Sequence, residues 1–144
     1  MNSVACAILY RNGEVLLGRR SLHSSTYWNC WDFIGGHVEK GESLLEALTR
    51  ELGEELSIVP TSATLIETIG EPDPATNGEA VYYVFEVLGW EGEPTMLGDE
   101  HSELKWFSVA DACSLPNLAL AAYVPVLKRL SARQIQTQAL PPTW

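Results

Sequence analysis

The stretch that decides the fold runs from Gly36 to Ile58 and reads GHVEKGESLLEALTRELGEELSI. Within it, Ser43 and Glu46 have the spacing of a helix-capping box. Good helix formers follow without a break, so the pattern predicts a helix over residues 43–56. It is the clearest helix signal in the chain.

Glutamates lie together along one shoulder of this predicted helix. At about 100° of rotation per residue, leucines form a core-facing stripe and carboxylates form a second stripe. The centre of the carboxylate stripe lies about 110° from the apolar one, not opposite it, so a cleft could form beside it. The apolar stripe holds Leu45, Leu48, Leu52 and Leu56, and the acidic stripe holds Glu51, Glu54 and Glu55.

Gathering carboxylates on one helix face has a cost that a bound cation would remove. Like charges one turn apart repel by a few tenths of a kcal/mol per pair, here at the negative end of the helix dipole. Hard oxygen ligands suit Mg²⁺ or Mn²⁺. A solvated acidic face gives the same pattern, so the helix alone leaves metal binding and solubility as equal alternatives.

The spacing around the helix resembles the Nudix box, the signature of the Nudix hydrolases. The resemblance rests on Gly36-x5-Glu42-x7-Arg50-Glu51-Leu52-x-Glu54-Glu55-x-Ser57-Ile58. It departs from the family pattern at Ser57, where the family has glycine. Because glycine permits the left-handed conformation that ends a helix, serine costs about 1 kcal/mol if that conformation is kept. A looser resemblance extends over residues 18–20, 31–36 and 100–107.

The resemblance implies a divalent-metal site built from the carboxylates. Glu51 and Glu55 are then the principal Mg²⁺ ligands, with Mn²⁺ as a substitute, and Glu54 assists. The backbone carbonyl of Gly35 completes the site, and Glu51 and Glu54 also count as catalytic. Two or more metal ions would bridge a diphosphate and polarise an attacking water. The implied reaction is hydrolysis of the phosphoanhydride of a nucleoside diphosphate derivative.

Other matched positions of the box have supporting roles. The resemblance implies that Glu42 and Arg50 hold the loop–helix–loop together, so Arg50 joins the catalytic set as a positioning group. Glu42 and Gly36 are structural, with Gly36 serving a tight turn. The general base stays open among Glu103, Glu100 and a box glutamate. Glu103 is our candidate from the later loop, and an ordinary exposed glutamate before a strand is an equal interpretation.

Candidate substrate contacts precede the box. Arg19 and Arg20 end a predicted strand, where a guanidinium could pair with a phosphate or a terminal group of the substrate. Tyr27 and Trp31 could stack on a base. The alternatives are a surface role for the arginines and a core role for the aromatic residues.

The remaining predicted elements are strands and one further helix. Asn12-Gly13 predicts a hairpin turn. Gly35-Gly36 is expected to end the strand that precedes these two glycines. The further helix is expected over residues 118–133, with a kink or a division at Pro125. The predicted strands are residues 3–10, 14–20, 31–34, 64–69, 81–88 and 104–107.

These elements predict a mixed α+β layered domain. The family resemblance implies an α/β/α sandwich with a mixed central sheet, a catalytic loop–helix–loop and a C-terminal helix. We expect one Nudix hydrolase domain over residues 1–133 and a loosely ordered tail over residues 134–144.

Composition limits the classes of partner and location. The chain has 144 residues, which is the length of one domain, and 46% of its residues are hydrophobic. Its net charge of −10 argues against nucleic-acid binding, although divalent cations allow an acidic protein to hold a polyphosphate. The N-terminal apolar run is too short to span a membrane, and the three cysteines have no CxxC spacing. We therefore expect a cytoplasmic protein without a membrane partner.

Within the hydrolase class, the leading substrate is a nucleotide of the (d)NTP or 8-oxo-dGTP type. The competing interpretation is ADP-ribose or another nucleotide sugar, since Pro74 resembles a proline of some ADP-ribose-cleaving relatives. A non-catalytic nucleotide-binding module is a third alternative, against which the intact box carboxylates argue. Many relatives are homodimers, so a homodimer is the assembly that the resemblance suggests.

Overall fold

The computed structural model describes residues 1–130, and these form a mixed sheet with helices. The expected tail over residues 134–144 and the end of the last helix lie outside the described residues. The strands are β1 (Asn2–Arg11), β2 (Glu14–Arg20), β3 (Trp31–Asp32), β4 (Ile34–His37), β5 (Val59–Gly70), β6 (Ala80–Glu91) and β7 (His101–Ser108). The helices are α1 (Leu44–Leu56), α2 (Pro74–Asn77) and α3 (Val109–Cys113).

Strand β1 is the centre of the sheet. The strand order is β3-β2-β1-β6-β5, with β4 also paired to β1 and β7 to β2. β1 runs parallel to β6 and antiparallel to β2 and β4, so the sheet is mixed as predicted. The hairpin between β1 and β2 turns at Asn12 and Gly13, whose φ angles of 54° and 78° suit this sequence.

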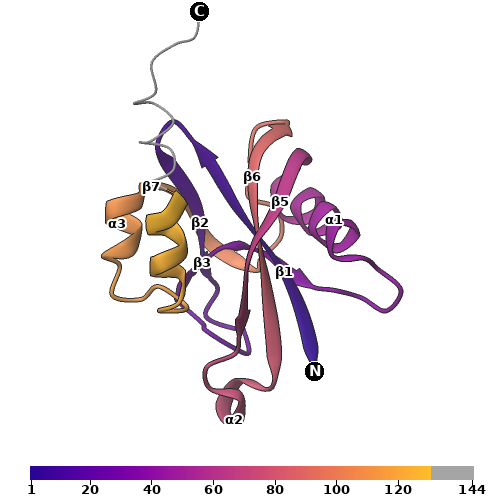
Figure 1. Cartoon of the computed structure of the whole chain (residues 1–144), viewed down its shortest axis with the longest axis vertical. Helices are drawn as coiled ribbons and strands as arrows, with labels where there is room; N and C mark the ends of the chain where they lie inside the picture. Colours follow the sequence, from indigo (N-terminus) through magenta and orange to yellow (C-terminus); the bar gives the residue numbers. More distant parts are fainter. Residues whose placement is uncertain (131–144) are drawn as a thin grey trace, which may run out of the picture.

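Helices cover both faces of the sheet, which confirms the expected sandwich (Figure 1). On one face, α1 buries Leu48, Leu52 and Leu56 against apolar side chains of the sheet such as Phe85. On the other face, α3 and the helical residues 123–130 form a second apolar cluster with the sheet. Within residues 1–130, no helix has the length and apolarity needed to cross a membrane.

The prediction that Gly35-Gly36 ends a strand is wrong. β4 runs through both glycines, which pair with Cys6 and Ala5 of β1. A side chain at Gly35 would collide with the backbone of Ala5. Gly35 is therefore required by the close approach of two strands, not by a turn.

The further helix also differs from its prediction. Residues 123–130 are helical, so the helix begins five residues later than 118, after the separate helix α3. Leu118 instead forms an isolated bridge with Trp31. Pro125 falls in the first helical turn, where a missing N–H breaks no intrahelical bond, so it causes no kink within the described residues.

Candidate active site

Helix α1 begins where the capping box predicts. The Glu46 N–H donates to Ser43 Oγ at 3.1 Å, and the Ser43 N–H donates to Glu46 Oε1 at 2.9 Å. The buried face is rotated relative to the prediction, since it includes Ala47 and two glutamates but excludes Leu45, which is 51% exposed. The carboxylates thus lie within the buried face of the helix, not only on its shoulder.

Two of the box glutamates meet a third from a distant loop. One carboxylate oxygen each of Glu51, Glu55 and Glu100 lie within 4.8 Å of one another, and we call these three residues the acidic cluster. Glu51 is 8% exposed and Glu55 is 5% exposed, whereas the Glu100 side chain is exposed. Glu54 lies outside the cluster, with a side chain that is 62% exposed.

The acidic cluster is electrostatically unfavourable without a cation. Neither carboxylate oxygen of Glu55 has a hydrogen-bond partner among the described residues, and both are buried. Burial and then the neighbouring Glu100 carboxylate raise the pKa of Glu55 to about 10. Burial also raises the pKa of Glu51, although the hydrogen bond from Arg50 opposes this effect. Buried, unpartnered oxygens of this kind fit a hard divalent cation.

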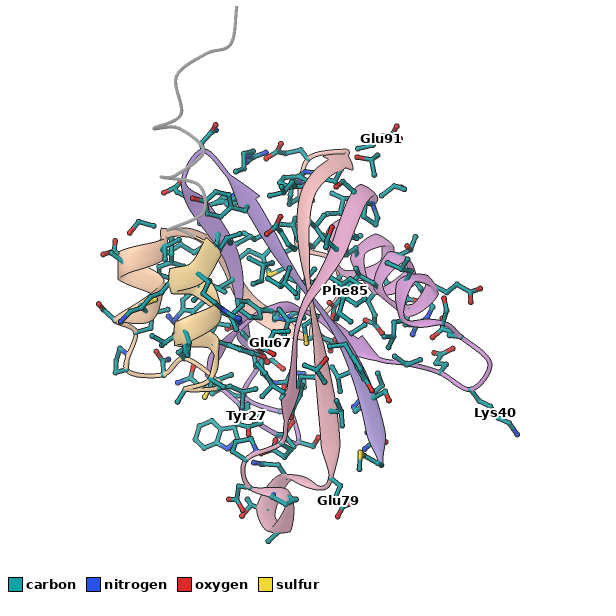
Figure 2. All side chains as sticks on the ribbon, in the orientation of Figure 1. Tyr27, Lys40, Glu67, Glu79, Phe85 and Glu91 are labelled. Carbon is teal, nitrogen blue, oxygen red and sulfur yellow. The ribbon has the colours of Figure 1, made fainter. Side chains whose placement is uncertain are left out.

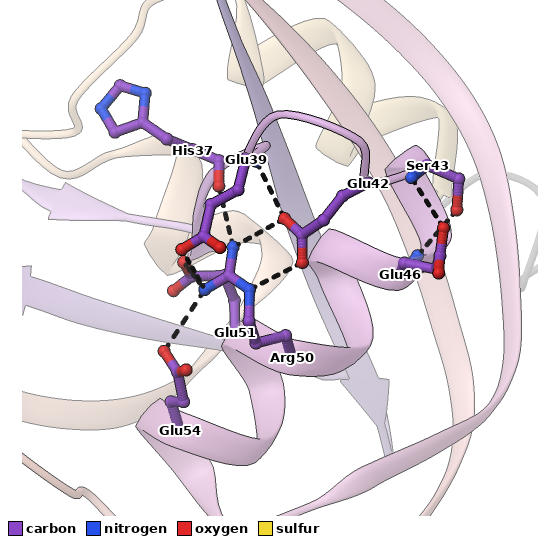
Figure 3. Close-up of polar contacts among 8 residues, drawn as sticks. All are labelled: His37, Glu39, Glu42, Ser43, Glu46, Arg50, Glu51 and Glu54. Carbon is purple, nitrogen blue, oxygen red and sulfur yellow. Dashed lines mark hydrogen bonds and ion pairs between the residues drawn. The ribbon is translucent and has the colours of Figure 1, made fainter.

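Arg50 connects the loop before α1 to the acidic cluster (Figure 3). Its Nε and Nη2 donate to the two oxygens of Glu42 at 2.8 and 3.0 Å, a bidentate pair that lowers the pKa of Glu42 to about 2. Its Nη1 donates to Glu51 Oε1 at 2.8 Å and, at 3.4 Å, to Glu54. Nη2 also donates to the His37 carbonyl at 3.0 Å. The guanidinium of Arg50 therefore fixes the orientation of the Glu51 carboxylate.

Gly36 provides the space that Glu51 occupies. A Cβ atom at Gly36 would lie 2.5 Å from the carboxyl carbon of Glu51. Gly35 and Gly36 both line the cleft described below, so their backbone lies beside the acidic cluster. The need for glycine here comes from contact with the side chain of α1 and not from a tight turn.

The end of α1 is held by Ser57 and by the loop before β7. Ser57 has φ 59° and ψ 37°, the left-handed conformation for which the family pattern has glycine. The Thr95 N–H donates to the Leu56 carbonyl, and the Leu97 N–H donates to the Glu55 carbonyl, both at 2.9 Å. This loop, residues 92–100, carries Glu100 to the cluster.

A cleft of about 420 Å³ opens over the acidic cluster. Glu51, Glu100 and the Gly35-Gly36 backbone line one part of it. A second part, which we call the aromatic end, is lined by Arg20, Tyr27, Asp32, Phe33 and Tyr82. The cleft therefore joins an acidic surface, whose carboxylates could hold a cation, to a surface of rings and hydrogen-bonding groups, which suits a ligand with a polyphosphate and a base.

The structure separates the candidate substrate contacts. Arg20 and Tyr27 line the cleft, and Arg20 Nε donates to the Thr26 carbonyl at 2.8 Å. Trp31 is 5% exposed and packs edge-on against Phe107 at 5.0 Å between ring centroids, so it belongs to the core. Trp31 is not among the residues that line the cleft.

Arg19 and Glu103 are not brought to the cleft either. Arg19 Nη2 pairs with Glu103 Oε1 at 3.0 Å, and its guanidinium lies 5.0 Å from the Trp31 ring centroid. Of the two later glutamates, the structure brings Glu100 to the acidic cluster and leaves Glu103 in an ion pair.

Asp32 and Tyr82 line the cleft but were not predicted. Asp32 Oδ1 accepts hydrogen bonds from Tyr123 Oη at 2.7 Å and from the Phe33 N–H at 2.8 Å. Burial raises the pKa of Asp32. An acidic residue inside the apolar run of residues 31–34 was the available sequence signal for Asp32. Tyr82 gave none, because its hydrogen bond to Glu71 depends on the pairing of β5 with β6.

Comparisons with known proteins agree with this geometry. The sequence model of the NUDIX domain matches residues 1–130. The chain is 34% identical over 133 residues to the CTP pyrophosphohydrolase of Escherichia coli (strain K12), covering 92% of this chain and 93% of the relative. It is 31% identical over 112 residues to the ADP-ribose pyrophosphatase of Methanocaldococcus jannaschii, covering 78% of this chain and 63% of the relative. A MutT NUDIX hydrolase from Burkholderia pseudomallei superposes with a TM-score of 0.78 at 29% identity, covering 90% of this chain and 97% of that chain.

Proposed function

The chain belongs to the NUDIX family of hydrolases, and from that premise we propose that it is a Mg²⁺-dependent pyrophosphohydrolase of nucleoside triphosphates. The observation that carries the proposal is the pair of buried, unpartnered oxygens of Glu55 beside Glu51 and Glu100. They lie next to a cleft large enough for a nucleotide.

The metal-holding residues we propose are Glu51, Glu55 and Glu100. Glu54 would assist them, and the backbone carbonyl of Gly35 on β4 would complete the site. Glu100 is an addition to the set that the sequence suggested, and its proximity to the other two supports it. Bound Mg²⁺, or Mn²⁺ in its place, would supply charge neutralisation for the diphosphate and acidify an attacking water.

The protein groups position the reactants. Arg50 is held by its bidentate pair with Glu42 and donates a hydrogen bond to Glu51, so it keeps the Glu51 carboxylate oriented. For the general base, proximity to the cluster favours Glu100 over Glu103, whose carboxylate is engaged by Arg19. Arg20 and Tyr27 line the cleft where they can contact the nucleoside part of the substrate.

The similarity to a CTP pyrophosphohydrolase over almost the full length of both chains supports a nucleoside triphosphate as substrate. The products would be a nucleoside monophosphate and pyrophosphate. ADP-ribose is the second candidate, favoured by the similarity to an ADP-ribose pyrophosphatase and by Pro74, which occupies the first turn of α2. The net charge of −10 favours free nucleotides over nucleic acid, and we propose a cytoplasmic location.

The test is a substrate panel with the purified protein in Mg²⁺. CTP, the dNTPs, 8-oxo-dGTP and ADP-ribose are compared for the wild type and for Glu51→Gln. Glu91→Gln is the matched control, because Glu91 is exposed and lies outside the residues that line the cleft (Figure 2). We expect the wild type and Glu91→Gln to release pyrophosphate from a nucleoside triphosphate, and Glu51→Gln to release none. Equal rates for the wild type and Glu51→Gln across the panel would refute the proposal, and faster turnover of ADP-ribose would select the second candidate.

A further inference from the structure

A second buried carboxylate, Glu71, accepts an unusually full set of hydrogen bonds. It is 8% exposed and follows the end of β5. Its donors are Tyr27 Oη at 2.7 and 2.8 Å, Tyr82 Oη at 2.7 Å, the Asp73 N–H at 2.8 Å and Asn77 Nδ2 at 3.4 Å. We call these five residues the Glu71 network.

The Glu71 network joins the loop between β2 and β3 to the segment that runs from the end of β5 through α2 into β6, with Tyr27 44 residues from Glu71 in the sequence. Tyr27 lies in the loop between β2 and β3, Asp73 and Asn77 belong to the turn of α2, and Tyr82 lies on β6. In Figure 2 the Tyr27 side chain lies toward the end of the molecule that carries α2, whereas Glu67 lies farther along β5. One carboxylate therefore ties a loop, a turn and a strand together.

The backbone at Tyr27 requires such an anchor. Tyr27 has φ 52°, and a left-handed conformation costs a residue with a side chain about 1–2 kcal/mol. Hydrogen bonds from its hydroxyl to both oxygens of Glu71, and from Asn77 Nδ2 to that hydroxyl at 3.2 Å, oppose this cost. Strained residues held in this way are frequent in binding sites.

The two tyrosines also form part of the aromatic end of the cleft. Tyr27 and Tyr82 both line it, whereas Glu71 lies behind them and is not among the lining residues. Removing the carboxylate would release both hydroxyls at once. The acidic cluster, on other elements, shares no hydrogen bond with the Glu71 network among the described residues.

We propose that Glu71 is a positioning residue that fixes Tyr27 and Tyr82 as the wall against which the nucleoside part of the substrate binds. This inference rests on the proposed function. Because the network shares no hydrogen bond with the acidic cluster among the described residues, we expect its loss to weaken ground-state and transition-state binding alike. Such a loss raises KM and leaves kcat nearly unchanged.

The experiment compares two substitutions with two matched controls. Glu71→Gln and Tyr82→Phe alter the network, and Tyr82→Phe keeps the ring. Glu67→Gln is the control on β5, four residues before Glu71, where Glu67 pairs with Arg129 at 2.7 Å. Tyr83→Phe is the neighbouring control, since Tyr83 packs on the opposite face of the sheet. With CTP as substrate, we expect both network variants to raise KM about 10-fold, with kcat within about 2-fold of wild type, and the controls to change neither.

Calorimetric titration of CMP separates this inference from the proposed function, because it needs no turnover. A wild type that binds CMP but hydrolyses nothing in the panel refutes the proposed function. The inference is supported if CMP binding weakens about 10-fold in Glu71→Gln and Tyr82→Phe only. It is overturned if KM and CMP affinity stay at wild-type values, or if kcat falls with KM unchanged. Should Glu71→Gln fail to fold, Tyr82→Phe decides.

Discussion

Glu55 and Glu71 are almost equally buried, at 5% and 8% exposure, but their surroundings are opposite. Glu71 accepts hydrogen bonds from two tyrosines, an amide and a backbone N–H, whereas neither oxygen of Glu55 has a partner among the described residues. The pKa of Glu71 is lowered because these hydrogen bonds outweigh its burial. Burial and the nearby Glu100 raise the pKa of Glu55 to about 10.

The difference separates a structural carboxylate from one that is prepared for a ligand. A buried polar group without a partner costs about 1–3 kcal/mol, and more if it is charged. The fold avoids that cost completely at Glu71 and accepts it at Glu55. Under the proposed function, a bound cation would remove the cost at Glu55. Three substitutions test this contrast.

The largest expected effect is on activity, in Glu55→Gln. Hydrolysis of CTP in saturating Mg²⁺ should fall about 100-fold or more, because the proposed metal-holding set loses a carboxylate. The thermal midpoint measured in EDTA should stay equal or rise, since the amide carries no charge beside Glu51 and Glu100 and can donate a hydrogen bond to their carboxylates. Mg²⁺ should stabilise the wild type, by about 2.7 kcal/mol at a hundred times its Kd, and should not stabilise the variant to that extent.

The contrast between Glu55 and Glu71 is refuted if Glu55→Gln lowers the thermal midpoint in EDTA, as the loss of a hydrogen-bonded carboxylate would. It also fails if Mg²⁺ raises the midpoint of the variant as much as that of the wild type. Glu91→Gln is again the control for a glutamate without a role in the site.

Glu71→Gln should show the reverse behaviour, with a loss of stability and a pH dependence. Hydrogen bonds to a charged group contribute about 1.5–3 kcal/mol, so we expect a loss of about 2 kcal/mol at neutral pH. Because the folded-state pKa of Glu71 is lowered, its stabilisation is present above the unfolded pKa and is lost as pH falls through the folded pKa. Urea unfolding of the wild type and the variant should therefore converge below about pH 4. A difference that is independent of pH would contradict the charged network.

The smallest expected effect concerns the end of the helix that carries Glu55. Ser57→Gly should stabilise the protein by about 1 kcal/mol, because Ser57 adopts the left-handed conformation at φ 59°. The thermal midpoint should rise by about 3 °C, with CTP hydrolysis unchanged. A fall in activity would mean that the helix exit helps to shape the acidic cluster.

The sequence was most informative where structure is local. The capping box, the hairpin at Asn12-Gly13 and the left-handed position at Ser57 depend on neighbouring residues, and the structure contains all of them. The box spacing also brought Glu42, Arg50 and Glu51 into one network, because Arg50 and Glu51 lie on one helix and Glu42 directly precedes its N-cap, Ser43.

Contacts between distant segments could not be predicted from the sequence in the same way. The role of Gly35 depends on its pairing with Cys6, and the place of Trp31 in the core depends on Phe107. Glu100 reaches the cluster, and Glu103 does not, because β7 pairs with β2 in a register that shifts between Arg19 and Arg20. Glu71 meets Tyr27 only after the loop between β2 and β3 has packed against the end of β5.

The loop of residues 92–100 restricts how this protein can change during evolution. Its Thr95 and Leu97 amides bind the last carbonyls of α1, and its final residue is Glu100. Surface loops ordinarily accept insertions and deletions. Here a gain or loss of one residue would disturb the cap of the helix and shift Glu100 at the same time, so the number of residues between Gly92 and Glu100 is constrained.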